Sequence, residues 1–258
     1  MKRTSRIFRT SVTSRPALLG AVVMLALTSA SVASADAGPG PLGVTAMAAV
    51  STHSVRVGAL FGADRAGTLT GGHFCTASVV HSPAHDLIVT AAHCVTGVGG
   101  PLVFVPGYRD GRAPYGVWKV GRRFLADGWA EDQDEDSDLA FAHVGALDGK
   151  EVEDVVGGNR FTTGTATGAT AVTVTGYPDS RETPISCTNK PAPHSRTQQR
   201  IGCPEFTGGT SGSPWINGDG QVVGVLGGHE QGGSTADVSY SVVLGRGAAQ
   251  LYSAALAP

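Results

Sequence analysis

Short β-branched runs separated by glycine- and proline-containing turns are the feature that most constrains this chain. The runs include VRVGAL (55–60), ASVV (77–80), LIVT (87–90), LVFV (102–105), AVTVTGY (171–177) and QVVGVLG (221–227). Many short strands with turn signals between them are typical of β-sandwiches and β-barrels. Near the end of the chain, GAAQLYSAAL (247–256) is expected to form one short helix. The chain is therefore predicted to be all-β with a short C-terminal helix.

The first 35 residues have the features of a secretory signal peptide. Basic side chains stand at its start, without any acid, at Lys2, Arg3, Arg6, Arg9 and Arg15. An apolar run follows over 17–27, and Ala33-Ser34-Ala35 matches the A-x-A pattern of a signal-peptidase site. The apolar run is shorter than the roughly 20 residues of a membrane helix. We therefore expect a secreted, extracellular protein without a membrane anchor.

The charge of the exported part argues against polyanionic partners. Five of the 19 basic residues and none of the 21 acidic residues lie in residues 1–35, so the formal charge changes from −2 to −7 on their removal. A mildly acidic protein lacks the positive charge that attracts nucleic acid or an anionic membrane. Neither is expected as a partner.

Composition also suggests boundaries along the chain. Residues 36–52 are small and irregular, and are expected to form a propeptide or flexible leader. The remaining roughly 200 residues are enough for one large β unit or two small barrels. A polar, glycine-bounded stretch at 145–158 suits a boundary, which would divide the rest into 53–150 and 151–258.

The exported part contains an even number of cysteines, at Cys75, Cys94, Cys187 and Cys203. In an oxidising compartment this count is typical of disulfides, and four cysteines allow three pairings. We favour the local pairs Cys75–Cys94 and Cys187–Cys203. Each would close a short loop and contribute about 3 kcal/mol in the loop-entropy model.

No metal or other cofactor is predicted. A zinc site built from His73, Cys75, His93 and Cys94 would match no common ligand spacing. The acidic run EDQDEDSD (131–138) could bind calcium, but it lacks the glycine-punctuated spacing of an EF-hand loop. Such a run is more often a solvated loop.

Three short motifs carry the chemistry of this sequence. TAAHC (90–94) directly follows an apolar run, SDLAF (137–141) leads from an aspartate into another, and GTSGSP (209–214) surrounds a serine with small residues. A serine hydroxyl needs a base within about 2.6–3.2 Å to become a nucleophile, and a carboxylate can orient that base. The motifs therefore suggest Ser211 as nucleophile, His93 as base and Asp138 as its orienting acid.

Two further choices follow from these motifs. Asp132, Asp134 and Asp136 compete with Asp138, but Asp138 abuts the apolar run LAFA, which would hold it rigidly. The glycines around the serine leave room for a substrate carbonyl, and the N–H groups of Gly209 and Ser211 are the natural donors to an oxyanion.

The three motifs resemble those of the chymotrypsin-like serine proteases, in particular secreted bacterial trypsin-like and glutamyl-endopeptidase-like enzymes. The resemblance extends from about Val55 to the C-terminus. It implies two packed antiparallel β-barrels, 53–150 and 151–258, with the catalytic cleft between them. It also implies that the Cys75–Cys94 disulfide pins the histidine loop. The expected protein is a cofactor-free monomeric endopeptidase that forms an acyl-enzyme on polypeptide substrates, with a protein protease inhibitor as a further candidate partner.

The resemblance has two departures near the serine, and one of them is Ser213, where many members of the family have glycine. Thr210 stands where animal enzymes carry an aspartate that pairs with a newly cut N-terminus. Activation of a zymogen by that ion pair is therefore not open to this chain.

Substrate specificity stays open between three alternatives. The expected pocket walls are the segments before and after the serine, with Glu205, Gly208, Leu226, Gly227, Gly228 and His229. Glu205 would favour a basic P1 side chain, His229 would favour an acidic one, and a small or apolar P1 side chain is the third alternative.

Two other classes of protein compete with the endopeptidase. An α/β-hydrolase would need the order serine, acid, histidine, which is the reverse of the order here. A non-catalytic, protease-like binding protein is the remaining alternative, although such proteins usually lack a triad residue.

Overall fold

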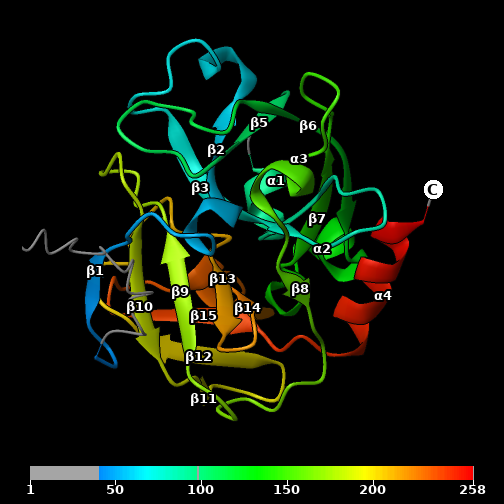
Figure 1. Ribbon diagram of the computed structural model, residues 1–258. Helices are drawn as coiled ribbons and strands as arrows, with labels where there is room; N and C mark the ends of the chain where they lie inside the picture. Colours follow the sequence, from blue (N-terminus) through cyan, green and yellow to red (C-terminus); the bar gives the residue numbers. More distant parts are fainter. Residues whose placement is uncertain (1–40, 98, 258) are drawn as a thin grey trace, which may run out of the picture. The chain divides into compact units, whose positions relative to one another are not determined.

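The computed structural model describes residues 41–97 and 99–257 (Figure 1). The expected signal peptide, residues 1–35, lies outside the described residues. Within the described part, none of the helices is both long and apolar enough to cross a membrane.

The first half of the described chain forms a closed β-barrel. Its strands, in barrel order, are β2 (Val57–Gly62), β3 (His73–Val80), β4 (Leu87–Thr90), β7 (Ala140–Val144), β6 (Trp118–Leu125) and β5 (Leu102–Pro106). All neighbours in this barrel pair antiparallel. Because side chains alternate along a strand, Val79 packs in one core cluster with Leu60, Phe104 and Trp118, whereas its neighbour Val80 packs in another. Closure leaves the barrel without free strand edges.

Two sheets form the second half, and one of them includes a strand from the start of the described chain. One has the order β1 (Thr45–Met47), β10 (Ile185–Asn189), β9 (Val172–Gly176), β13 (Pro214–Asn217), β14 (Gln221–Val225) and β8 (Arg160–Phe161). The other has the order β11 (Ala192–Pro193), β12 (Gln198–Gly202) and β15 (Val238–Val242). Ile201 of β12 packs in one cluster with Val174 and Trp215, so both sheets enclose the same core. The all-β prediction is confirmed.

Helices are short and few in the described chain. They are α1 (Ala92–Thr96), α2 (Asp127–Asp132), α3 (Val152–Val156) and α4 (Arg246–Leu256), and 3-10 turns cover Ser54–Arg56, Ala63–Arg65, Glu135–Ser137 and His229–Gly232. The C-terminal helix α4 confirms the prediction for 247–256. Its Leu251 and Ala255 are buried in a cluster with Phe141 of β7 and Val225 of β14. The two halves of the described chain thus share one apolar core beneath α4.

The segment expected as a leader contributes a strand to this fold. Residues 45–47 form β1, which pairs antiparallel with β10, and the amide of Ala48 donates to the carbonyl of Pro184 over 2.9 Å. Thr45 adds a side-chain hydrogen bond to the carbonyl of Pro204. Residues 45–48 therefore belong to the sheet and do not behave as a flexible leader, whereas the expectation that 36–52 includes a propeptide stays a prediction.

Both disulfides form as predicted. Cys75 of β3 is bonded to Cys94 of α1, and Cys187 of β10 is bonded to Cys203, with Cα–Cα distances of 6.0 and 5.9 Å. The first ties the helix that carries His93 to the barrel wall. The second lies in the core of the second half.

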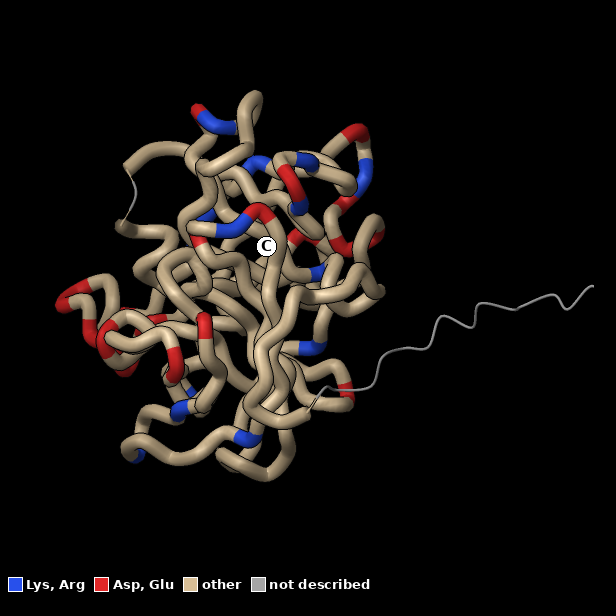
Figure 2. Tube along the Cα trace, turned by 90° about the vertical axis from the view of Figure 1, so that its left-hand side faces the viewer, with Lys and Arg blue, Asp and Glu red and all other residues tan. Residues whose placement is uncertain are grey.

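Charged residues are unevenly distributed over the described chain. Figure 2 shows a group of acidic residues gathered in loops at the left of the view, whereas the basic residues are scattered. The predicted second unit, residues 151–258, begins between β7 and β8, and its boundary stays a prediction.

Candidate active site

A buried aspartate holds His93 in place. His93 lies in α1, directly after β4, and Asp138 lies just before β7, which pairs with β4. Oδ2 of Asp138 is 2.8 Å from Nδ1 of His93, and Oδ1 accepts the backbone N–H of His93 over 3.0 Å. The strand pairing thus brings together two side chains that are 45 residues apart.

The carboxylate of Asp138 has a third donor from the second half of the chain. The N–H of Gly228 donates to Oδ2 over 2.8 Å, and Asp138 is fully buried. Buried carboxylates need such hydrogen bonds, because burial otherwise destabilises a charge. With Nδ1 of His93 directed at Asp138, Nε2 is the ring nitrogen left to accept a proton.

The competing acids have other contacts. Oδ1 of Asp134 accepts the N–H of Asp136, and Asp136 accepts a hydrogen bond from the side chain of Gln198 over 2.8 Å. Asp132 is the last residue of α2 and is exposed. Among the described acids of the run 131–138, the geometry brings Asp138 to the histidine.

The loop that carries Ser211 docks on the strands that position His93. The N–H of Thr76 in β3 donates to the carbonyl of Ser211 over 2.7 Å. Gly212 has a φ of +86°, and a Cβ there would lie 2.0 Å from the carbonyl oxygen of Thr76 and 2.2 Å from Oγ1 of Thr90. A glycine is therefore required for the serine loop to approach the barrel this closely.

Side-chain hydrogen bonds hold the same loop from within. Oγ1 of Thr210 donates to the carbonyl of Thr207, and Oγ of Ser213 donates to the carbonyl of Thr210, both over 2.6 Å. Thr210 is almost fully buried. At the position where the resemblance would place an ion-paired aspartate, this chain has a turn closed by neutral hydrogen bonds.

Two backbone amides next to Ser211 are free to bind a ligand. Within the described residues, neither the N–H of Gly209 nor that of Ser211 donates a hydrogen bond. Gly209 has a φ of +87°, and a Cβ there would lie 2.5 Å from both Tyr177 O and Asp179 N. Unengaged amides on a rigid turn are what an oxyanion site requires.

The hydroxyl of Ser211 is not hydrogen-bonded to His93. Its partner is the carbonyl of Gln231, 3.5 Å away, although Ser211 and His93 line the same cavity of about 370 Å³. In enzymes without substrate, catalytic hydrogen bonds are often long and tighten when substrate binds. In the structure, His93 is therefore hydrogen-bonded to Asp138 but not to Ser211.

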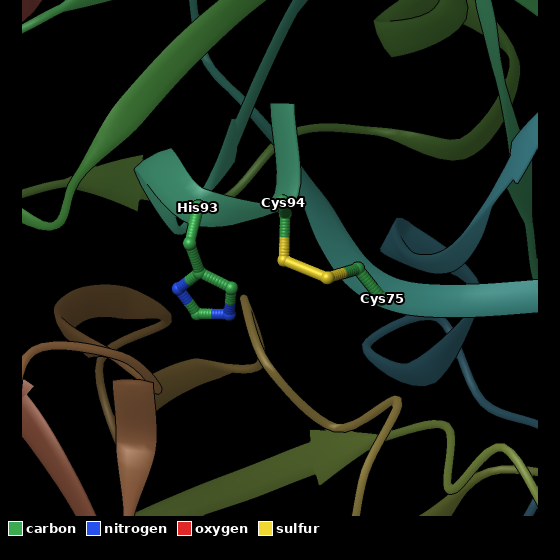
Figure 3. Close-up of side chains that lie close together, drawn as sticks. All are labelled: Cys75, His93 and Cys94. Atoms are coloured by element: carbon green, nitrogen blue, oxygen red, sulfur yellow. A yellow bond between two sulfur atoms is a disulfide. The ribbon is translucent and has the colours of Figure 1, made fainter. Parts of the chain in front are cut away.

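Part of the cavity wall is formed by residues that lie outside the three sequence motifs. Phe74, Trp129 and Gln231 line it together with the Cys75–Cys94 disulfide, which lies beside the imidazole of His93 (Figure 3). The indole of Trp129 donates to Oγ1 of Thr96 over 3.1 Å and its ring centre is 6.3 Å from that of His93. Trp129 could have been noticed as an isolated aromatic residue in an acidic segment.

The residues expected in a specificity pocket lie outside this cavity. Glu205 is half exposed and forms an ion pair with Arg181. Leu226 is buried in the core of the second half. His229 stacks against His194, with ring centres 4.7 Å apart, and against Tyr240.

The three glycines expected in the specificity pocket, Gly208, Gly227 and Gly228, lie close to carboxylates. A Cβ on Gly208 would lie 2.9 Å from a carboxylate oxygen of Asp179, and one on Gly227 would lie 2.8 Å from Oδ2 of Asp138. Gly228 donates to Asp138, as described above. The structure therefore uses Gly227 and Gly228 to approach the aspartate closely.

The zinc interpretation of this region is excluded by its disulfide. Donor atoms of Cys75, His93 and Cys94 lie within 4.8 Å of one another. Both sulfur atoms are joined to each other, so no thiolate remains to bind a metal. The ring of His73 lies elsewhere, with Nε2 2.9 Å from the carbonyl oxygen of Pro178.

Comparisons with known proteins agree with this geometry. The crystal structure of protease Anisep from Arthrobacter nicotinovorans is 28% identical and covers 81% of this chain and 98% of that chain, with a TM-score of 0.69. The thermostable serine protease AL20 from an extremophilic microorganism is 27% identical and covers 80% of this chain and 98% of that chain, with a TM-score of 0.67. A Glu endopeptidase in complex with MPD has a TM-score of 0.66 over 85% of this chain and 99% of that chain, and at 17% identity it shares the fold.

Sequence comparison gives the family. No curated protein sequence matches the chain. The family model of the trypsin-like peptidase domain matches residues 75–225, which include His93, Asp138 and Ser211. The chain therefore belongs to the trypsin-like peptidase family and is a serine endopeptidase.

Proposed function

We propose that the protein is a secreted endopeptidase that cleaves peptide bonds through His93, Asp138 and Ser211 and an acyl-enzyme intermediate. One observation carries this proposal. A buried carboxylate orients the imidazole of His93 in the cavity that also contains Ser211, next to two unengaged amides.

Each group has one role in the reaction. Oγ of Ser211 attacks the scissile carbonyl while Nε2 of His93 takes its proton, and Asp138 stabilises the resulting imidazolium. The N–H groups of Gly209 and Ser211 donate to the negative oxygen of the tetrahedral intermediate. His93 then protonates the leaving amine, and a water molecule hydrolyses the acyl-enzyme by the same steps.

The first step requires a rotation of the serine side chain. Oγ of Ser211 must leave the carbonyl of Gln231 and turn toward His93. The contact with Gln231, at 3.5 Å, is at the long limit of a hydrogen bond and is therefore weak. Binding of a peptide would replace it.

A small or apolar P1 side chain is the specificity that the contacts favour. Arg181 already pairs with Glu205, and the ring nitrogens of His229 lie 3.5 and 3.9 Å from carboxylate oxygens of Glu135 and Glu230, so each side chain already has a partner within the chain. Phe74 and Trp129 add apolar surface to the cavity that contains Ser211, beside polar residues such as Gln133. A library of peptides with every P1 residue, cleaved by the mature protein, tests this proposal; strong preference for lysine, arginine or glutamate would contradict it.

Export and trimming are part of the proposal. The two disulfides suit an oxidising compartment. We expect N-terminal sequencing of the protein from culture supernatant to begin after Ala35 or further along the chain. Recovery of a chain that still begins at Met1, in the membrane fraction, would contradict export.

A serine-directed phosphonate tests the enzymatic mechanism. We expect mass spectrometry to find one label, on Ser211, and no label on the Ser211→Ala variant. Label on another serine, or full activity of Ser211→Ala, would overturn the assignment. A folded wild-type protein that takes no label would favour the non-catalytic binding protein.

A further inference from the structure

A second group of histidines and carboxylates lies outside the active site. His81 and His85 belong to the loop HSPAHD between β3 and β4, and Glu153 belongs to α3. One donor atom from each of these three side chains lies within 4.8 Å of the other two. The catalytic reaction uses none of them.

The backbone around this group is held by hydrogen bonds. The N–H of Glu153 donates to the carbonyl of His85 over 3.0 Å, and the N–H of Ser82 donates to Oε2 of Glu153 over 3.1 Å. The N–H of His81 donates to the carbonyl of Asn159 over 2.9 Å. The loop and α3 therefore present their side chains from fixed positions.

The carboxylate of Glu153 is largely withdrawn from solvent. Its side chain is 13% exposed, whereas that of His81 is 60% exposed. One carboxylate oxygen is engaged by the Ser82 amide, and the other lies 2.7 Å from Nδ1 of His81. A carboxylate withdrawn from water needs a nearby cation or donors, and here it faces two imidazoles.

His85 has a backbone conformation that costs energy. Its φ is +59°, in the left-handed region that residues with a side chain seldom adopt. The preceding loop and the contact with Glu153 hold it there. Such strain is common where a side chain is aimed at a ligand.

From these positions we propose that His81, His85 and Glu153 bind one divalent transition-metal ion, for which Zn²⁺ has the best-matched ligand preference. Two imidazole nitrogens and one carboxylate oxygen form a common set of three protein ligands for zinc, with the fourth position open to water. Asp154, which is 2.6 Å from Nδ1 of His85, is placed to orient that ring from outside the metal.

The bound ion would join segments that are distant in the sequence. It would connect the β3–β4 loop of the barrel to α3, which lies in the connection toward the second half. The hydroxyl of Tyr252 in α4 donates to the carbonyl of His81, so the C-terminal helix contacts the same loop. The ion would thus stabilise the folded state without acting in catalysis.

The test uses untagged Ser211→Ala protein, because a histidine tag would bind zinc and autolysis would obscure the result. After dialysis against EDTA, we expect titration with ZnCl₂ in a calorimeter to give one equivalent bound per chain. Saturating zinc should raise Tm by about 5 °C, since an ion that binds only the folded state stabilises it.

Variants in the same background assign the site. We expect His81→Ala and His85→Gly to lower the zinc affinity at least tenfold and to reduce the rise in Tm at the same zinc concentration. His85→Gly is the sharper variant, because glycine accepts the positive φ and should leave the metal-free Tm unchanged or higher. Glu153→Gln keeps the shape of the side chain and should also weaken zinc binding. If this variant does not fold, the zinc affinity of His85→Gly tests the proposal.

The matched control is His143→Ala, which removes a neighbouring histidine paired with Asp86 at 2.8 Å but outside the proposed ligand set. It should keep the zinc affinity of the parent. Absence of saturable binding by the parent would overturn the proposal. So would binding that survives His81→Ala and His85→Gly, or that is lost in His143→Ala or His93→Ala.

Discussion

The amide of Gly228 donates to Oδ2 of Asp138, the oxygen that also lies 2.8 Å from Nδ1 of His93. Gly228 and Asp138 are 90 residues apart, in different halves of the described chain. The second half, which supplies Ser211, therefore also supplies a donor to the carboxylate that is hydrogen-bonded to His93. Assembly of the two halves sets the geometry of all three side chains.

Asp138→Asn is expected to lower kcat by about 10⁴, because the amide would favour the wrong tautomer of the His93 ring. The fold should persist, since the asparagine side chain has nearly the same shape. Peptide-substrate kinetics and circular dichroism measure the two effects. Asp136→Asn is the matched control and should change kcat little; an equal loss in that variant would contradict the assignment of the acid.

Gly209→Ala is expected to lower kcat by about 10²–10³, the range for loss of one oxyanion donor. A Cβ at this position would lie 2.5 Å from Tyr177 O and Asp179 N, so the amide must move. Gly218→Ala is the control, because a Cβ there would meet nothing within 4 Å. Steady-state kinetics of both variants check this prediction, and unchanged kcat in Gly209→Ala would refute it.

Removal of the Cys75–Cys94 disulfide, by substitution of both residues with alanine, is expected to reduce both stability and activity. The loop-entropy model gives a loss of about 3 kcal/mol in the free energy of unfolding. Activity should fall because α1 carries His93 next to Cys94. Removal of Cys187–Cys203 should destabilise the protein similarly yet spare kcat in the folded fraction, as urea titration and kinetics would show.

Gln231→Gly is expected to raise the free energy of unfolding by about 1 kcal/mol. Gln231 has a φ of +54°, and the left-handed conformation costs roughly 1–2 kcal/mol for a residue with a side chain. Gln221→Gly, in β14, is a control with the opposite expected sign. It should lower the free energy of unfolding by about 0.5–1 kcal/mol. Both measurements need the Ser211→Ala background to prevent autolysis. Equal destabilisation by the two substitutions would argue against strain at Gln231.

The N-terminal strand gives a prediction about trimming. Deletion of residues 36–50 from the exported chain would remove β1 and expose the edge of β10, which pairs with it at Thr45, Ala46 and Met47. We expect a lower Tm and a greater tendency to aggregate, because an uncovered strand edge is a template for pairing. Thermal unfolding and light scattering compare the Tm and the aggregation of the deleted chain with those of the intact exported chain. An unchanged Tm would show that β1 contributes no stability.

Local patterns in the sequence were enough to predict the all-β class, the C-terminal helix and both disulfides. They also identified His93, Asp138 and Ser211 as candidates. These predictions depend on information that is local: strand-forming runs between turn residues, a short cysteine spacing, and reactive side chains in distinctive motifs. Gly209 could be singled out for the same reason, since it stands two residues before the serine in the same motif.

Contacts between distant segments could not be predicted in this way. The sequence does not show that Arg181 neutralises Glu205, that Trp129 walls the cavity, or that Gln231 contacts Ser211. It also does not show that residues 45–47 complete a sheet. Motifs determined which chemical groups this protein has, and strand pairing decided which of them meet, because hydrogen bonding between strands sets the distance between residues that the sequence leaves far apart.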